Sequence, residues 1–286
     1  MKNNFIMFFK TNWAKIILLF LCIIVIVSLA LFFVPNWFGR KNFADSVSSL
    51  NKKSSIFYLS KIYCYSSATG LNAKEGKAMW NIDVSQYTDI ALSLNINNVK
   101  DIISNDVQVV DADSKYSISK VYIDNISFSN NNFENLSLSY IPFVNFGLIT
   151  DEDISNSTEQ QNRIDFNIVN NKESLLNNVN LEPSIDEDLI LPITLRYLNK
   201  NIKTGHVINN IEESLTFDGS ILKRASIPLS SIKNDVSFTI HIINKLDEDY
   251  SYPVSLQIPL QNSDGSKSIY DGNYSEETNL NDSYFY

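Results

Sequence analysis

The chain carries two hydrophobic patterns, one continuous and one alternating. Residues 16–34 are apolar except for Ser28. As a helix, this run spans roughly 28 Å at 1.5 Å per residue, close to the ~30 Å hydrocarbon core of a bilayer. Trp13 and Trp37 flank the run, where aromatic side chains anchor a helix at the membrane interface. The pattern predicts a transmembrane helix over residues 16–34, with Trp13 and Trp37 as membrane-interface residues.

An alternative for this run is a cleaved signal peptide, with Ser28 and Ala30 at the cleavage site. Residues 31–34 continue the apolar run past that point, which favours a retained signal-anchor. Basic residues flank both sides almost equally, so they set the orientation weakly. The short N-terminal tail favours a cytoplasmic N-terminus, with residues 35–55 as a stalk and the rest of the chain extracytoplasmic.

Beyond the stalk, apolar and polar residues alternate with a period of two, which is typical of half-buried strands. The clearest runs are residues 90–96, 136–140, 164–168, 191–197, 236–242 and 254–260. Weaker runs cover residues 56–65, 117–128 and 215–222, and Asp218-Gly219 is a pair typical of tight hairpin turns.

Because no long helical pattern interrupts these strands, we expect an all-β soluble region with an antiparallel β-sandwich. The polar stretch 151–163 divides it, which favours two tandem sandwiches over residues 56–150 and 163–261; one large sandwich is the alternative. The polar segment 262–286 is expected to be a flexible tail. Residues 1–15 complete this plan as a short cytoplasmic tail.

Charge narrows the classes of partner. Residues 1–44 hold five Lys or Arg and no acid, whereas residues 45–286 hold 18 basic and 32 acidic residues, a net charge of −14. Such a surface repels phosphate backbones, so we expect no nucleic-acid partner. The two cysteines, Cys22 and Cys64, form neither a disulfide framework nor a metal motif.

Catalytic groups are scarce. His206 and His241 are the two histidines, and neither has metal-ligand spacing or a Gly-x-Ser-x-Gly motif to support a catalytic triad. We therefore predict that the protein is not an enzyme and has no cofactor. Two alternatives rest on acidic loops: a calcium site or a glycan hydrolase. The acids concerned lie at residues 151–153, 186–188 and 247–249, and at Asp111 and Asp113.

One aromatic stretch suggests a ligand. Trp80, Asp83, Ser85 and Tyr87 lead into a predicted strand. Over about ten residues this stretch resembles the start of strands in jelly-roll carbohydrate-binding modules. The resemblance implies that Trp80 and Tyr87 stack on a sugar ring; burial in the core is the alternative.

The sequence thus predicts a single-pass membrane protein whose extracytoplasmic β-sandwich is a non-catalytic binding or structural module of the cell envelope. Its expected partners are the lipid bilayer and an unknown protein or envelope glycan. A second hypothesis is an accessory subunit of a membrane-bound assembly of the secretion or division type, and a third is the acidic-loop glycan hydrolase.

Overall fold

A computed structural model describes residues 56–76, 79–97, 116–130, 135–156, 162–170, 172–177, 182–209, 216–281 and 283–286. Residues 1–55, which hold the predicted cytoplasmic tail, the transmembrane helix with Trp13 and Trp37, and the whole stalk, lie outside these residues. Among the described helices, none combines the length and the apolar character needed to cross a bilayer.

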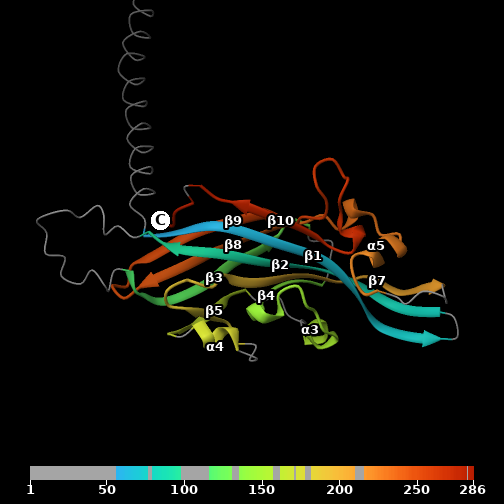
Figure 1. Cartoon of the computed structure of the whole chain (residues 1–286), viewed down its shortest axis with the longest axis horizontal. Helices are drawn as coiled ribbons and strands as arrows, with labels where there is room; N and C mark the ends of the chain where they lie inside the picture. The colour runs from blue at the N-terminus through green and yellow to red at the C-terminus, as the bar shows by residue number, and fades with distance from the viewer. Residues whose placement is uncertain are drawn as a thin grey trace, which may run out of the picture. The chain divides into compact units, whose positions relative to one another are not determined.

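Within the described residues, ten strands form two five-stranded sheets (Figure 1). Sheet A has the order β10-β1-β2-β7-β4, and sheet B the order β6-β5-β3-β8-β9. All neighbours are antiparallel except β5 and β6, which pair in parallel. The strands are β1 (Phe57–Gly76), β2 (Met79–Ile96), β3 (Ile118–Phe128), β4 (Leu136–Tyr140), β5 (Ile164–Val169), β6 (Ser184–Asp186), β7 (Ile193–Asn209), β8 (Asp235–Asn244), β9 (Asp249–Gln257) and β10 (Tyr274–Asn279).

The hydrophobic core lies between the two sheets, which makes the fold β-sandwich-like. Buried and half-buried residues alternate strictly along β8, as the period of two predicts. Aromatic contacts join the sheets: Phe128 of β3 lies 5.8 Å from Tyr197 of β7, centroid to centroid. Tyr140 of β4 meets Phe166 of β5 edge-on, also at 5.8 Å. The predicted all-β class is confirmed.

The described strands do not separate into two tandem sandwiches. Sheet A joins β1, β2 and β4 to β7 and β10, and sheet B joins β3 to β8 and β9. Each sheet therefore combines strands from both predicted halves, and residues 55–286 form one compact unit. The predicted domain boundary at residues 151–163 is wrong. These residues are polar because they lie on the surface of the sandwich, where Asp151–Asn156 forms a short helix, α3.

The predicted flexible tail is part of the sandwich. β10 pairs with β1, Tyr284 forms a bridge with Tyr58, and Tyr286 exchanges two backbone hydrogen bonds with Ser251 of β9. Phe285 is fully buried in the core. This arrangement could not be predicted from the hydrophobic pattern. β10 is an edge strand with five of its six residues exposed, and such a strand needs no apolar face.

Residues 215–222 do not form the predicted strand and hairpin within the described residues. Ser220–Arg224 is a helical turn, α5, and Gly219 precedes it in a right-handed helical conformation. A Cβ on Gly219 would meet the carbonyl oxygen of Ile269 in η4 (Ile269–Asp271), so close packing explains the glycine. The remaining short helices are α4 (Lys172–Leu176), η2 (Phe143–Asn145) and η3 (Leu229–Ser231).

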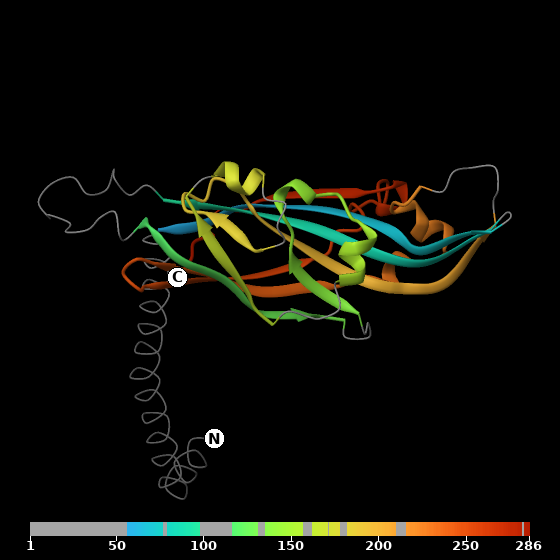
Figure 2. The same ribbon diagram turned by 90° about the horizontal axis from the view of Figure 1, so that it is seen from below.

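The segment of residues 141–156, which holds η2 and α3, covers part of the outer face of sheet A. Ile154 of α3 is fully buried against Leu71, Tyr87 and Leu198 in a small second cluster. This segment and α4 lie on the same side of the molecule in both views (Figures 1 and 2). Sheet A is therefore buried on both faces where this segment crosses β2 and β7.

Candidate functional site

Of the predicted stacking pair, Tyr87 is not exposed as a platform for a sugar ring. Trp80 lies in β2, but its side chain is outside the described residues. Tyr87 is 4% exposed, and its hydroxyl lies 3.4 Å from the carbonyl oxygen of Gly147 in the covering segment. Within this structure, Tyr87 is a buried packing residue, and a sugar would need the covering segment removed to reach it.

A buried ion pair lies beside Tyr87. Asp89 of β2 and Arg196 of β7 face each other across the ladder and form two hydrogen bonds of 2.6 and 2.7 Å. Arg196 also lies 5.1 Å from the ring centroid of Tyr87. Burial raises the pKa of the Asp89 carboxyl, and Arg196 opposes that rise. Burial lowers the pKa of Arg196, but the hydrogen bonds to Asp89 and the negative charges of Asp89 and Asp153 together raise it above its ordinary value, so Arg196 stays charged.

This pair holds the covering segment in place. Arg196 donates to the carbonyl oxygens of Leu148 at 2.5 Å and Asn145 at 3.3 Å, while Asp89 accepts from the N–H of Gly147 at 2.7 Å. Gly147 has a φ of +77°, which glycine adopts without strain. These contacts occupy the charges, so the arrangement positions the segment rather than a ligand.

A second polar cluster lies on the outer face of sheet B. The rings of Tyr122 and His241 stack with centroids 4.4 Å apart, and Arg163 lies 3.7 Å from the centroid of Tyr122. His241 Nδ1 is 3.1 Å from Asp249 Oδ1. Its Nε2 is 3.3 Å from Asp124 Oδ1, in a geometry that makes no hydrogen bond.

The three described acidic clusters belong to separate elements. Residues 151–153 open α3; Asp186 accepts backbone hydrogen bonds from Ile190 and Leu191; residues 247–249 join β8 to β9. Within the described ranges, no group of three or more acidic, histidine or cysteine side chains is arranged to hold a metal ion. Asp111 and Asp113 lie outside those ranges. The calcium hypothesis therefore gains no support from these loops.

Two further candidate groups in the described part are His206 and Cys64. His206 lies in β7, where burial and, to a smaller extent, the positive charge of Lys203 lower its pKa. Cys64 of β1 is buried, and burial raises its thiol pKa to about 12. A thiol with that pKa is not a nucleophile at neutral pH.

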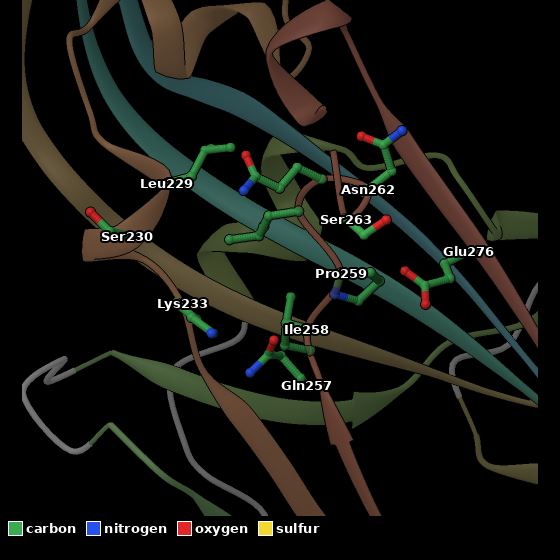
Figure 3. Close-up of a pocket in the computed structure, with 11 residues that line it drawn as sticks. Leu229, Ser230, Lys233, Gln257, Ile258, Pro259, Asn262, Ser263 and Glu276 are labelled. Atoms are coloured by element: carbon green, nitrogen blue, oxygen red, sulfur yellow. The ribbon is translucent and has the colours of Figure 1, made fainter. Parts of the chain in front are cut away.

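A cavity of about 470 Å³ opens where the edge of sheet A meets that of sheet B (Figure 3). Its floor is the buried run Ile258, Pro259 and Leu260, which carries the chain out of β9. Leu229 and Ser230 of η3 line one wall, and Glu276 of β10 lines another. The remaining lining residues are Lys233, Gln257, Gln261, Asn262 and Ser263.

The cavity combines an apolar floor with a polar rim. Figure 3 shows Lys233 and Glu276 on different sides of the opening, one positive and one negative. Within the described residues, Lys233 makes no ion pair, whereas the Asn262 amide is engaged by Ser266 and Lys267. A few fixed polar groups around apolar surface are typical of binding sites of 300–1,000 Å³.

Sequence reasoning missed this cavity because its residues come from three elements separated by up to 47 positions and share no motif. Pro259 was assigned to a strand that ends instead at Gln257, and Glu276 was assigned to a tail. Comparisons with family models, with curated proteins and with solved structures find no match for this chain.

Proposed function

We propose that this chain is a single-pass membrane protein of the cell envelope, and that its extracytoplasmic β-sandwich is a non-catalytic module that binds a partner in the cavity between β9 and β10. The observation that carries the proposal is the cavity itself. It joins an apolar floor to a rim with Lys233 and Glu276 on separate walls.

The lining favours binding over hydrolysis. Glycoside hydrolysis requires two carboxylates on either side of the scissile bond. Among the described residues of the lining, Glu276 is the one carboxylate. Amides, hydroxyls and the single ammonium are groups that recognise peptide bonds or sugar hydroxyls by hydrogen bonding.

Site-specific photocrosslinking in intact cells tests the binding site. A benzophenone amino acid at Ser263 lies on the cavity rim, and the same amino acid at Ser119 lies on sheet B as a matched control. We expect a discrete adduct from position 263, weakened by Glu276→Gln, and none from position 119. Equal adducts at both positions, or an adduct indifferent to Glu276→Gln, would contradict the proposal.

The membrane part of the proposal has its own test. Protease added to intact cells is expected to degrade residues 56–286, and mass measurement of the mature N-terminus is expected to find residues 1–34 retained. A domain protected until the cells are permeabilised would reverse the orientation, and a start after Ala30 would mean a cleaved signal peptide.

A further inference from the structure

β10 is the terminal strand of sheet A. It pairs with β1, and within the described residues no strand pairs with its other side. The strand runs for six residues, of which all but Tyr274 are exposed. A sheet edge of this kind presents unpaired N–H and C=O groups that form a template for another strand.

The register identifies which backbone groups face outward. Leu280 N–H donates to the carbonyl oxygen of Ser60, and Cα pairing continues with Thr278 opposite Ile62 and Glu276 opposite Cys64. In an antiparallel ladder every second residue bonds to the partner strand. The alternate residues Ser275, Glu277 and Asn279 therefore direct their N–H and C=O groups away from β1.

The other described edges are blunted. β9 contains Pro253, which has no N–H to donate, and Ser251 of β9 is already paired with the C-terminal Tyr286. β6 is three residues long and β4 five. β7 continues past β4 as an edge, but register shifts against β2 and the positive φ of Asn201 and Gly205 interrupt it. β1 continues past β10, and its ladder with β2 shifts register between Leu71 and Lys74. β10 has no proline and no bulge in its pairing with β1, so it is the described edge that is most open to strand addition.

The charge on β10 selects the occupant. Glu276 lines the cavity, while Glu277 on the opposite face forms an ion pair of 3.1 Å with Lys61. A second copy of this chain would bring the same two carboxylates against them, at a repulsive cost. A lysine-rich or arginine-rich strand would instead be attracted by Glu276 and by the net charge of −14 on residues 45–286.

We propose that the free edge of β10 binds an extended, cationic segment of a partner protein, which joins sheet A as a sixth strand. Backbone hydrogen bonds to Ser275, Glu277 and Asn279 provide affinity, and side chains at alternate positions of the added strand lie beside Glu276 at the cavity mouth. This inference rests on the proposed function, because it names the partner class for the same cavity.

Three nonapeptides provide the probe for the full chain in detergent micelles. Each alternates threonine with one other residue: lysine, glutamine or glutamate. We expect the lysine peptide to bind about tenfold more tightly than the glutamine peptide by fluorescence anisotropy, and the glutamate peptide not to bind. Equal affinity for all three would overturn the charge selection.

A matched pair of variants tests strand addition itself. Glu277→Pro removes an outward N–H without removing a bond to β1, whereas Glu277→Gln keeps that N–H and removes the charge. We expect Glu277→Pro to weaken the lysine peptide about tenfold or more and Glu277→Gln to retain most of its affinity. If Glu277→Pro fails to fold, a lysine peptide N-methylated at alternate residues makes the same test on the unmodified chain.

Undiminished binding in Glu277→Pro, or to the N-methylated peptide, would overturn the inference. So would a dimer of the full chain that excludes the peptide and dissociates in Glu277→Pro, because the occupant would then be a second copy. The proposed function fails separately: a crosslink at position 263 that depends on Glu276 would stand even if every peptide result were negative.

Discussion

Two clusters of the same three residue types lie on the outer faces of the two sheets. On sheet A, Arg196 binds Asp89 beside Tyr87; on sheet B, Arg163 binds Asp165 with two hydrogen bonds from its Nε and one from Nη2, and lies over Tyr122. The side chains of the first ion pair are 4% and 0% exposed, and those of the second 40% and 56%.

Burial, not composition, decides what each of these ion pairs does. In the covered cluster both charges are desolvated, and each guanidinium nitrogen of Arg196 donates to an acceptor of the protein. Removing one partner therefore leaves an uncompensated buried charge. In the open cluster, water and salt screen the same interaction. The first cluster therefore fixes residues 141–156 on sheet A, whereas the second leaves the face of sheet B accessible.

Arg196→Met makes the largest expected difference between the clusters. It removes the ion-pair partner of the buried Asp89 carboxylate and the Arg196 donor to the Leu148 carbonyl oxygen. We expect a loss of about 3–5 kcal/mol in the free energy of unfolding, measured by urea denaturation. Arg163→Met is the matched control, and we expect it to cost at most about 1 kcal/mol, because its ion pair is exposed. Equal losses in both variants would show that burial does not distinguish the two pairs.

Replacing both partners sharpens this result. Asp89→Leu combined with Arg196→Met removes both buried charges and is expected to recover part of the stability lost in Arg196→Met alone. Recovery should be incomplete, because Leu148 and Asn145 still lose their donor. A double variant less stable than Arg196→Met would contradict the assignment of the loss to an unpaired carboxylate.

Ile154→Ala tests whether the covering segment is packed as well as hydrogen-bonded. Ile154 is fully buried, so truncation should cost about 2 kcal/mol, at the low end for Ile→Ala because a short surface segment can close over the space. Hydrogen exchange at Gly147 should accelerate with it. Ile190→Ala, at a side chain 59% exposed, is the control that should change neither quantity.

The smallest expected effect concerns the pKa of Asp165. Hydrogen bonds from Arg163 hold it below the ordinary value of 3.8. Because the folded pKa is lowered, the contribution to stability is present above the ordinary value and disappears as pH falls through the folded pKa. NMR titration of the carboxyl carbon should show the pKa rising in Arg163→Met and in 1 M salt. A pKa indifferent to both changes would mean that Arg163 does not act on Asp165.

The hydrophobic pattern predicted strands well where one face is buried and the other is exposed to solvent. It failed where both faces are covered: Arg196 occupies a polar position of a clean alternating run, so the pattern placed it in solvent, yet it is 3% exposed. The one indication of a covered outer face in the sequence was Ile154, a single apolar residue within a polar stretch. No period in the sequence shows that residues 141–156 fold back over β2 and β7.

The cavity could not be predicted from the hydrophobic pattern, for a different reason. Its floor and walls come from the ends of elements, at η3, after β9 and in β10, where chain direction depends on tertiary packing. An edge strand carries no apolar face, so β10 resembled a tail. Only the pairing of β10 with β1 brings Glu276 to the opening.

Hydrogen exchange of the full chain with and without the lysine nonapeptide tests whether the seam between β9 and β10 is the binding surface. We expect slower exchange in residues 257–263 and 274–279 together, with no change around Tyr122 and His241 on sheet B. Slower exchange on the outer face of sheet B, with the seam unchanged, would contradict it.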